Sequence, residues 1–151
     1  MKKRLISHGR PAQVLLVDDN RGDALLAAHA FKTASFETTL THAATGELAL
    51  KMLNEDVSLP DLVLLDLQLP QMSGMDVLVA IKSDERLKHI PVIVLSNSGD
   101  DHNVTRSYRH HASAYLIKPL DLARYRETIA LIEQFFFVLA RLPVVYDRAY
   151  E

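Results

Sequence analysis

The chain alternates short apolar runs with longer segments in which apolar and polar residues are mixed. Nearly uninterrupted apolar runs over residues 14–17, 62–65 and 90–96 predict strands buried on both faces, as in a parallel sheet covered by helices. Residues 114–117 predict another short strand, and the Thr-rich stretch 37–43 predicts a weaker one because few of its residues are apolar. The pattern therefore predicts five strands.

The segments between and after these strands have the spacing of amphipathic helices. Asp23 is placed to cap or charge the start of the first helix, and residues 98–101 have the spacing of a capping box that would open the fourth. In the last helix, Ile129, Ile132 and Phe136 are expected to form the inner stripe. The five predicted helical segments are 21–34, 45–53, 74–82, 98–111 and 121–142.

Strands that alternate with helices of this length make repeated βαβ units with right-handed crossovers. The expected fold is α/β, a flavodoxin-like doubly wound five-stranded parallel sheet with strand order 2-1-3-4-5. An extended C-terminal helix and a short tail follow it. The expected division of the chain is an N-terminal arm over residues 1–12, one domain over 13–135, and a helix extension and tail over 136–151.

Composition excludes several classes of protein. A net charge of −2 argues against a broad basic face for nucleic acid, so the basic residues 2–4 are expected to be a solvated arm. The absence of cysteine excludes disulfides, thiol redox chemistry and Cys-zinc sites. No apolar run approaches the length of a bilayer span, so the expectation is a soluble cytoplasmic protein without a membrane partner.

Polar residues stand where four of the predicted strands end. Asp18 and Asp19 follow the first strand, Asp66 ends the third, Ser96 ends the fourth and Lys118 follows the fifth. In the expected strand order these ends converge at one edge of the sheet, where open α/β folds bind their ligands. Gathered carboxylates raise one another's pKa unless a cation lies among them, and hard oxygen ligands suit Mg²⁺.

The two remaining side chains suit a phosphoryl group. Lys118 offers a compact positive charge and Ser96 a hydroxyl donor, and both match phosphoryl oxygens. The set therefore predicts a phosphoryl-accepting site with Asp66 as the nucleophile.

Four motifs, taken together, resemble the receiver domain of two-component response regulators over residues 13 to about 135. They fall in the order and spacing of that family. In chain order they are Val-Asp-Asp-Asn from residue 17, Leu-Leu-Asp-Leu-Gln-Leu-Pro-Gln-Met-Ser-Gly from residue 64, Val-Leu-Ser from residue 94, and Tyr-Leu-Ile-Lys-Pro from residue 115.

The resemblance implies a role for each matched residue. Asp66 would take a phosphoryl group from a histidine of a sensor kinase. The residues that would hold Mg²⁺ are Asp18, Asp19 and Asp66, together with the backbone carbonyl of Gln68. Ser96 and Lys118 would bind the phosphoryl group.

Two further features are implied by the same resemblance. The peptide bond between Lys118 and Pro119 would be cis, and the aromatic ring of Tyr115 would turn inward on activation. Asn97 stands where receivers usually have a small residue, which leaves the lifetime of the phosphoryl group open.

The runs Asn-Arg-Gly-Asp-Ala from residue 20 and Arg-Leu-Pro from residue 141 are similar to those of stand-alone regulators that partner bacterial phytochrome kinases. In that group the C-terminal segment helps to form a homodimer. Phe135, Phe136 and Phe137 are the candidate contacts, because one helix face cannot bury three consecutive residues. A phosphotransfer protein is a further possible partner.

The expected function is therefore a single-domain response regulator, not an enzyme, that signals through altered partner binding. One alternative is a binding-only pseudo-receiver. A phosphohydrolase of the haloacid dehalogenase type is disfavoured because such enzymes carry a second acid two residues after the nucleophile, where this chain has Gln68. A DNA-binding regulator is disfavoured because only about eight residues follow the last helix, too few for a helix-turn-helix unit.

Overall fold

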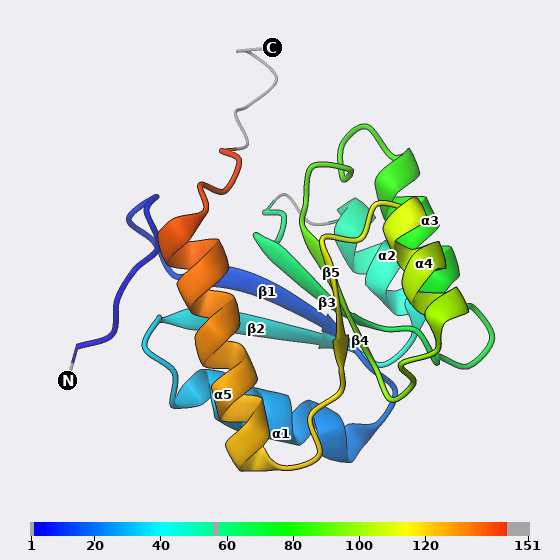
Figure 1. Ribbon diagram of the computed structural model, residues 1–151. Coiled ribbons are helices and arrows are strands. Elements are labelled where there is room, and N and C mark those ends of the chain that lie inside the picture. Colours follow the sequence, from blue (N-terminus) through cyan, green and yellow to red (C-terminus); the bar gives the residue numbers. More distant parts are fainter. Residues whose placement is uncertain (1, 56–57, 145–151) are drawn as a thin grey trace.

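The computed structural model describes residues 2–55 and 58–144. Within these residues, parallel strands form one sheet in the order β2-β1-β3-β4-β5, which confirms the predicted fold (Figure 1). The strands are β1 (Ala12–Val17), β2 (Thr38–Ala43), β3 (Leu62–Asp66), β4 (Val92–Ser96) and β5 (Ala114–Ile117).

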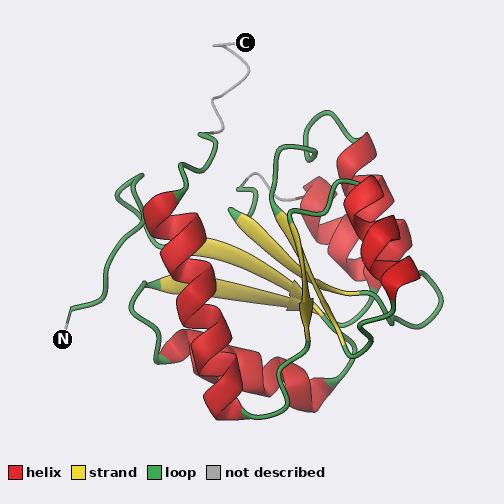
Figure 2. Cartoon of the chain, viewed as in Figure 1, coloured by secondary structure: helices red, strands yellow, loops and turns green. Residues whose placement is uncertain are grey.

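Helices cover both faces of the sheet (Figure 2). Helices α1 and α5 pack on one face, and α2 and α3 pack on the other. None of the helices in residues 2–55 and 58–144 is long and apolar enough to cross a bilayer. The helices are α1 (Arg21–Lys32), α2 (Gly46–Glu55), α3 (Gly74–Ser83), α4 (Asp101–Arg109), α5 (Leu122–Glu133) and the π-helical segment η1 (Gln134–Leu139).

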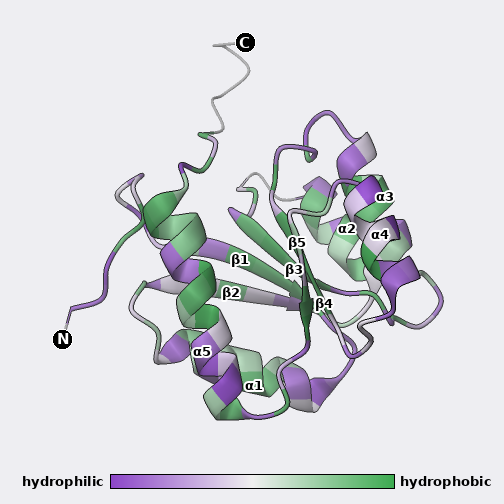
Figure 3. Ribbon diagram, in the orientation of Figure 1, coloured by the Kyte–Doolittle hydropathy of each residue, from purple (hydrophilic) through white to green (hydrophobic). Residues whose placement is uncertain are grey.

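The two central strands explain why the site forms at the sheet edge. Every residue of β3 and β4 is buried, and both strands are hydrophobic up to their last residues, Asp66 and Ser96 (Figure 3). In β3, Leu62 and Leu64 face the α1–α5 layer, whereas Val63 and Leu65 face the α2–α3 layer. The parallel register then brings the carboxyl ends of neighbouring strands level with one another, as in the pairing of Asp66 with Leu95.

The start of α4 differs in detail from the prediction. The side chain of Asp100, and not that of Ser98, caps α4 by accepting hydrogen bonds from the backbone N–H groups of His102 and Asn103. A carboxylate is as good an N-cap as a hydroxyl, so the spacing alone does not decide between neighbouring candidates.

The segment before β1 packs on the domain, contrary to the loose arm expected from its basic composition. Arg4 forms an isolated parallel bridge with Phe36, and its guanidinium carbon lies 4.8 Å from the centroid of the Phe36 ring. Ile6 is buried, and the Arg10 guanidinium pairs with the buried Asp61 carboxylate at 2.7 Å. The prediction failed because it counted the charges of this segment without their partners in the distant loops.

The C-terminal helix buries a different aromatic residue from the one predicted. Ile129 and Ile132 are buried as expected, but Phe136 is only half-buried and Phe137 takes the core position. The ring centroids of Phe137 and Phe36 lie 5.4 Å apart in an edge-to-face contact. In the π-helical segment, hydrogen bonds join residues five apart, so the side chain five positions after Ile132 continues the inner stripe.

Candidate phosphoryl-transfer site

The five predicted site residues meet at the carboxyl edge of the sheet. Asp66 is the last residue of β3 and Ser96 the last of β4, and Asp18, Asp19 and Lys118 directly follow β1 and β5. Four of these side chains are buried, whereas Asp19 is exposed. The backbone N–H of Lys118 donates to the carbonyl oxygen of Ser96 at 2.8 Å, which holds the ends of β4 and β5 together.

Three acids form a cluster that could hold a metal ion. Within the described part of the chain, one carboxylate oxygen from each of Asp18, Asp19 and Asp66 lies within 4.8 Å of the others. Burial raises the pKa of Asp18, and the charge of Asp66 adds to that effect, although a hydrogen bond from Lys118 opposes it. An all-oxygen set with one exposed member suits a hard, partly hydrated divalent cation.

Lys118 is the cation already present among these acids. Its Nζ lies 2.9 Å from Asp18 Oδ2, 3.1 Å from Asp66 Oδ2 and 2.9 Å from Asp23 Oδ2. Burial alone would lower the pKa of Lys118, but the carboxylates of Asp23 and Asp18 outweigh it and raise the pKa above its ordinary value. The side chain is therefore a charged ammonium held next to the proposed nucleophile.

Sequence reasoning missed two residues of this site. Asp23 was assigned only to the start of α1, where Asn20 in fact accepts the capping hydrogen bond from the backbone N–H of Asp23. The sequence places Asp23 in the first turn of a helix that follows Asp19, but only the orientation of α1 brings its carboxylate to Lys118. Tyr125 of α5 is also buried, and its pKa is raised by burial and by the charge of Asp23.

The backbone around Asp66 fixes the direction of its carboxylate. The N–H of Gln68 donates to Asp66 Oδ1 at 3.0 Å, while the Gln68 side chain is exposed. Gly74 begins α3 directly against this strand end, since a Cβ at that position would lie 2.1 Å from the carbonyl oxygen of Asp66. The role of the Gln68 carbonyl as a metal ligand stays a prediction.

The loop after β4 connects Ser96 to Tyr115. Ser96 Oγ accepts a hydrogen bond from the backbone N–H of Ser98 at 3.2 Å. The hydroxyl of Tyr115 donates a hydrogen bond to the carbonyl oxygen of Ser98. The Tyr115 side chain is half-buried in this arrangement. Its function as a switch stays a prediction.

The expected cis bond before Pro119 is wrong for this structure. All peptide bonds in the described residues are trans, including that between Lys118 and Pro119. The trans form is the intrinsically favoured isomer of an X–Pro bond.

The three consecutive phenylalanines lie in different surroundings. Phe137 is in the core, so its assignment to a dimer interface is wrong, and Phe136 is half-buried against the same core. Phe135 is exposed. Together with other exposed apolar residues at helical spacing it forms what is here named the α5–η1 patch, which consists of Leu131, Phe135, Val138 and Leu139.

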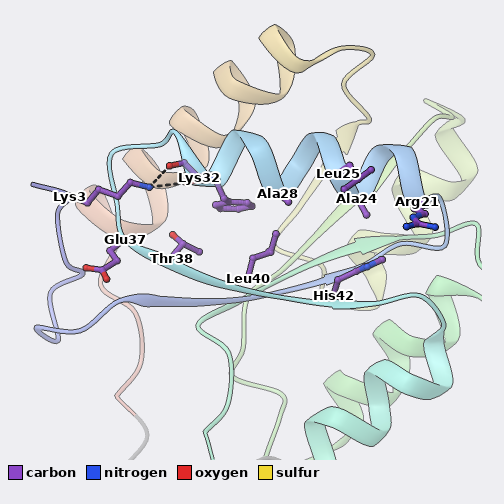
Figure 4. Close-up of a pocket in the computed structure, with 11 residues that line it drawn as sticks. Lys3, Arg21, Ala24, Leu25, Ala28, Lys32, Glu37, Thr38, Leu40 and His42 are labelled. Atoms are coloured by element: carbon purple, nitrogen blue, oxygen red, sulfur yellow. Dashed lines mark hydrogen bonds between the residues drawn. The ribbon is translucent and has the colours of Figure 1, made fainter. Parts of the chain in front are cut away.

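A separate groove lies between α1 and β2 (Figure 4). It has a volume of about 450 Å³, and Leu25, Ala28 and Leu40 form its apolar centre. Arg21 and His42 lie at the end nearer the acids, and the His42 Nε2 atom is 2.7 Å from the carbonyl oxygen of Asp18. Among the described residues, none of the acids Asp18, Asp19 and Asp66 lines this groove, so the groove is distinct from the candidate phosphoryl-transfer site.

Comparison with known proteins identifies relatives of this arrangement. Residues 14–130 match the response regulator receiver domain. The chain is 39% identical over 137 residues to the probable methanogenesis regulatory protein FilR2 of Methanothrix harundinacea, covering 88% of each chain.

Solved structures of response regulators resemble this chain in both sequence and fold. The phosphorylated cyanobacterial phytochrome response regulator RcpA superposes with a TM-score of 0.83 at 34% identity, over 89% of this chain and 99% of that one. The Mn²⁺-bound form of response regulator Rcp1, a protein of Synechocystis, gives a TM-score of 0.80 at 34% identity, over 89% of this chain and all of that one.

Proposed function

The chain belongs to the response regulator receiver domain family, and on that premise we propose that Asp66 accepts a phosphoryl group from a histidine of a sensor kinase. One carboxylate oxygen of Asp66 forms a bond to phosphorus while the bond between phosphorus and the kinase imidazole breaks. The observation that carries this proposal is the position of Asp66, in contact with Lys118 and close to both Asp18 and Asp19.

The other site residues would bind the metal ion and the phosphoryl oxygens. Asp18, Asp19, Asp66 and the backbone carbonyl of Gln68 would hold Mg²⁺. The Mn²⁺-bound form of Rcp1 supports this proposal to the extent that a similar protein binds a divalent cation. When bound, the cation offsets the negative charge of the phosphoryl oxygens. The Lys118 ammonium and the hydroxyl of Ser96 donate hydrogen bonds to those oxygens.

A phosphorylation assay tests the assignment of the nucleophile. Acetyl phosphate with Mg²⁺ is expected to add one phosphoryl group to the wild type, detected by intact mass, and none to Asp66→Asn. The exposed acid Glu127 provides a matched control, and Glu127→Gln should be phosphorylated like the wild type. Modification of Asp66→Asn to the wild-type extent would contradict the proposal.

The signalling output is a change of binding surface. Contacts of the phosphoryl oxygens with Ser96 and Lys118 exist only in the phosphorylated protein, so they shift the population toward the arrangement that makes them. The hydrogen bond between Tyr115 and Ser98 links this change to the surface formed by α4, β5 and α5. Similarity to RcpA makes a phytochrome kinase the leading candidate for the donor, and a phosphotransfer protein is a candidate acceptor.

We further infer that the protein forms a homodimer through the α5–η1 patch. Leu131 is 71% exposed and Leu139 70% exposed, which is a large apolar area for a helix surface that faces only water. A second copy covers this area with the same residues in a two-fold symmetric contact.

A further inference from the structure

Asp23 lies where its carboxylate can control the position of the Lys118 ammonium. Among the described residues, the three carboxylates of Asp18, Asp23 and Asp66 contact the Lys118 ammonium. An ammonium group has three N–H donors, so these acids can accept all of them. Lys118 is therefore fully engaged before any phosphoryl group arrives.

A phosphoryl oxygen must compete with these acceptors for the N–H donors of Lys118. Asp66 carries the phosphoryl group, and Asp18 belongs to the metal cluster. Asp23 has neither role, and its side chain is 24% exposed whereas that of Asp18 is 2% exposed. Water can replace the lost hydrogen bond at Asp23 but not at Asp18, so Asp23 is the acceptor that is released at the lowest cost in free energy.

We propose that Asp23 is a positioning residue that competes with the phosphoryl group for the Lys118 ammonium. In the unmodified protein it holds Nζ at 2.9 Å and pulls the ammonium toward α1. In the phosphorylated protein a phosphoryl oxygen takes its place. This inference rests on the proposed function and adds that the acid of α1 sets the balance between the two forms.

The anchoring of Asp23 makes this competition specific. Its backbone N–H donates to the side chain of Asn20, which fixes the first turn of α1 and aims the carboxylate at the sheet edge. The substitution Asp23→Asn keeps this backbone bond and the size of the side chain, and removes only the charge. The ion pair with Lys118 then becomes a weaker hydrogen bond from the charged ammonium to an uncharged amide oxygen.

Binding of beryllofluoride, a stable mimic of the phosphoryl group, measures the competition directly. With saturating Mg²⁺, Asp23→Asn is expected to bind beryllofluoride three- to tenfold more tightly than the wild type by calorimetry. Asp23→Glu restores the charge and should return the affinity toward the wild-type value. Glu127→Gln changes the net charge by the same amount away from the site and should leave the affinity unchanged.

Mg²⁺ affinity in the absence of beryllofluoride separates positioning from a structural role. If Asp23 has only a structural role, its replacement weakens the binding of both Mg²⁺ and beryllofluoride. The competition instead predicts that Asp23→Asn changes the two affinities in opposite directions, with beryllofluoride bound more tightly. In the metal-free protein, the ammonium protons of Lys118 should exchange faster with water in Asp23→Asn, as followed by ¹⁵N NMR, because one of three acceptors has been weakened.

The outcomes distinguish this inference from the proposed function. If the wild type binds beryllofluoride and Asp23→Asn binds it equally or more weakly, the competition is wrong while the receiver assignment stands. If the wild type binds no beryllofluoride and accepts no phosphoryl group, the proposed function fails and this inference falls with it.

Discussion

At the scale of single residues, the site depends on the close approach of α3 to the end of β3 as much as on charge. Gly74 allows α3 to begin against the end of β3, where a Cβ would lie 2.1 Å from the Asp66 carbonyl oxygen and 2.5 Å from Leu67 Cα. Both of these atoms belong to the backbone, which cannot move aside as a flexible side chain can. The position of Asp66 and the packing of α3 are therefore coupled.

Gly74→Ala is expected to lower the free energy of unfolding by about 1–3 kcal/mol, because relief of the contact must displace α3 or the end of β3. Urea unfolding measures this loss, and acetyl phosphate should label Asp66 more slowly in the same variant. The matched control is Gly22→Ala in α1, where a Cβ would meet only the Asn20 side chain at 3.3 Å. An equal loss in both variants would contradict the argument.

At the scale of elements, Glu133 joins the end of α5 to the loop between α1 and β2. It is 3% exposed, and its Oε1 accepts a hydrogen bond from the backbone N–H of Ser35 at 3.3 Å. In the described residues its second oxygen, Oε2, has no hydrogen-bond partner. Burial raises the pKa of Glu133 above its ordinary value of 4.5 because the charged form loses hydration that these contacts replace only in part.

This raised pKa makes the stability depend on pH with a defined sign. Above pH 4.5 the folded state holds the proton of Glu133 more tightly than the unfolded state does. The contribution of Glu133 to the free energy of unfolding therefore falls as pH rises through the raised pKa. The unfolding free energy of Glu133→Gln relative to wild type should therefore rise, by on the order of 1 kcal/mol, between acidic and neutral pH.

Denaturant unfolding at several pH values checks this dependence. The exposed Glu127 is the control, and the difference between Glu127→Gln and wild type should change little over the same range. A difference for Glu133→Gln that stays constant with pH would show that the carboxyl is not perturbed in the folded protein.

Element by element, the sequence was informative where a local pattern decides the structure. The apolar runs of β3 and β4 predicted both the buried strands and the edge at which Asp66 and Ser96 end. The sequence was less informative where contacts between distant segments decide the structure. Neither the packing of Arg4 on Phe36 nor the shift from Phe136 to Phe137 follows from local spacing, because each depends on a partner far along the chain.

The same distinction holds within the site. Residues at strand ends were found because the parallel sheet alone brings them together. Asp23 was not found, because its contact with Lys118 depends on how α1 is oriented after the Asp19–Asn20 turn, and a helix-capping role explained the same residue locally.

At the scale of the whole molecule, the α5–η1 patch determines the predicted assembly. Light scattering is expected to show a dimer for the wild type, and Leu131→Asp should weaken dimerisation at least tenfold because a carboxylate would be buried in an apolar contact. Since Leu131 is 71% exposed, this substitution should not impair folding of the protomer.

Leu25→Asp is the matched control for this assembly. Leu25 is also an exposed leucine, but it lies on α1, so its replacement should leave the dimer intact. A monomeric wild type, or a dimer that Leu131→Asp does not affect, would contradict the predicted interface.

The flanking segments have a practical consequence for the whole molecule. His8 and Arg10 share a hollow with Leu142 and Pro143, beside Asp61 just before β3. This hollow lies at the amino end of the sheet, on the order of 15 Å from the carboxylates at the far end of the five-residue strand. A fluorophore attached at His8 or Pro143 would therefore leave the mouth of the phosphoryl-transfer site open to a docking kinase, so energy transfer could follow complex formation without obstructing it.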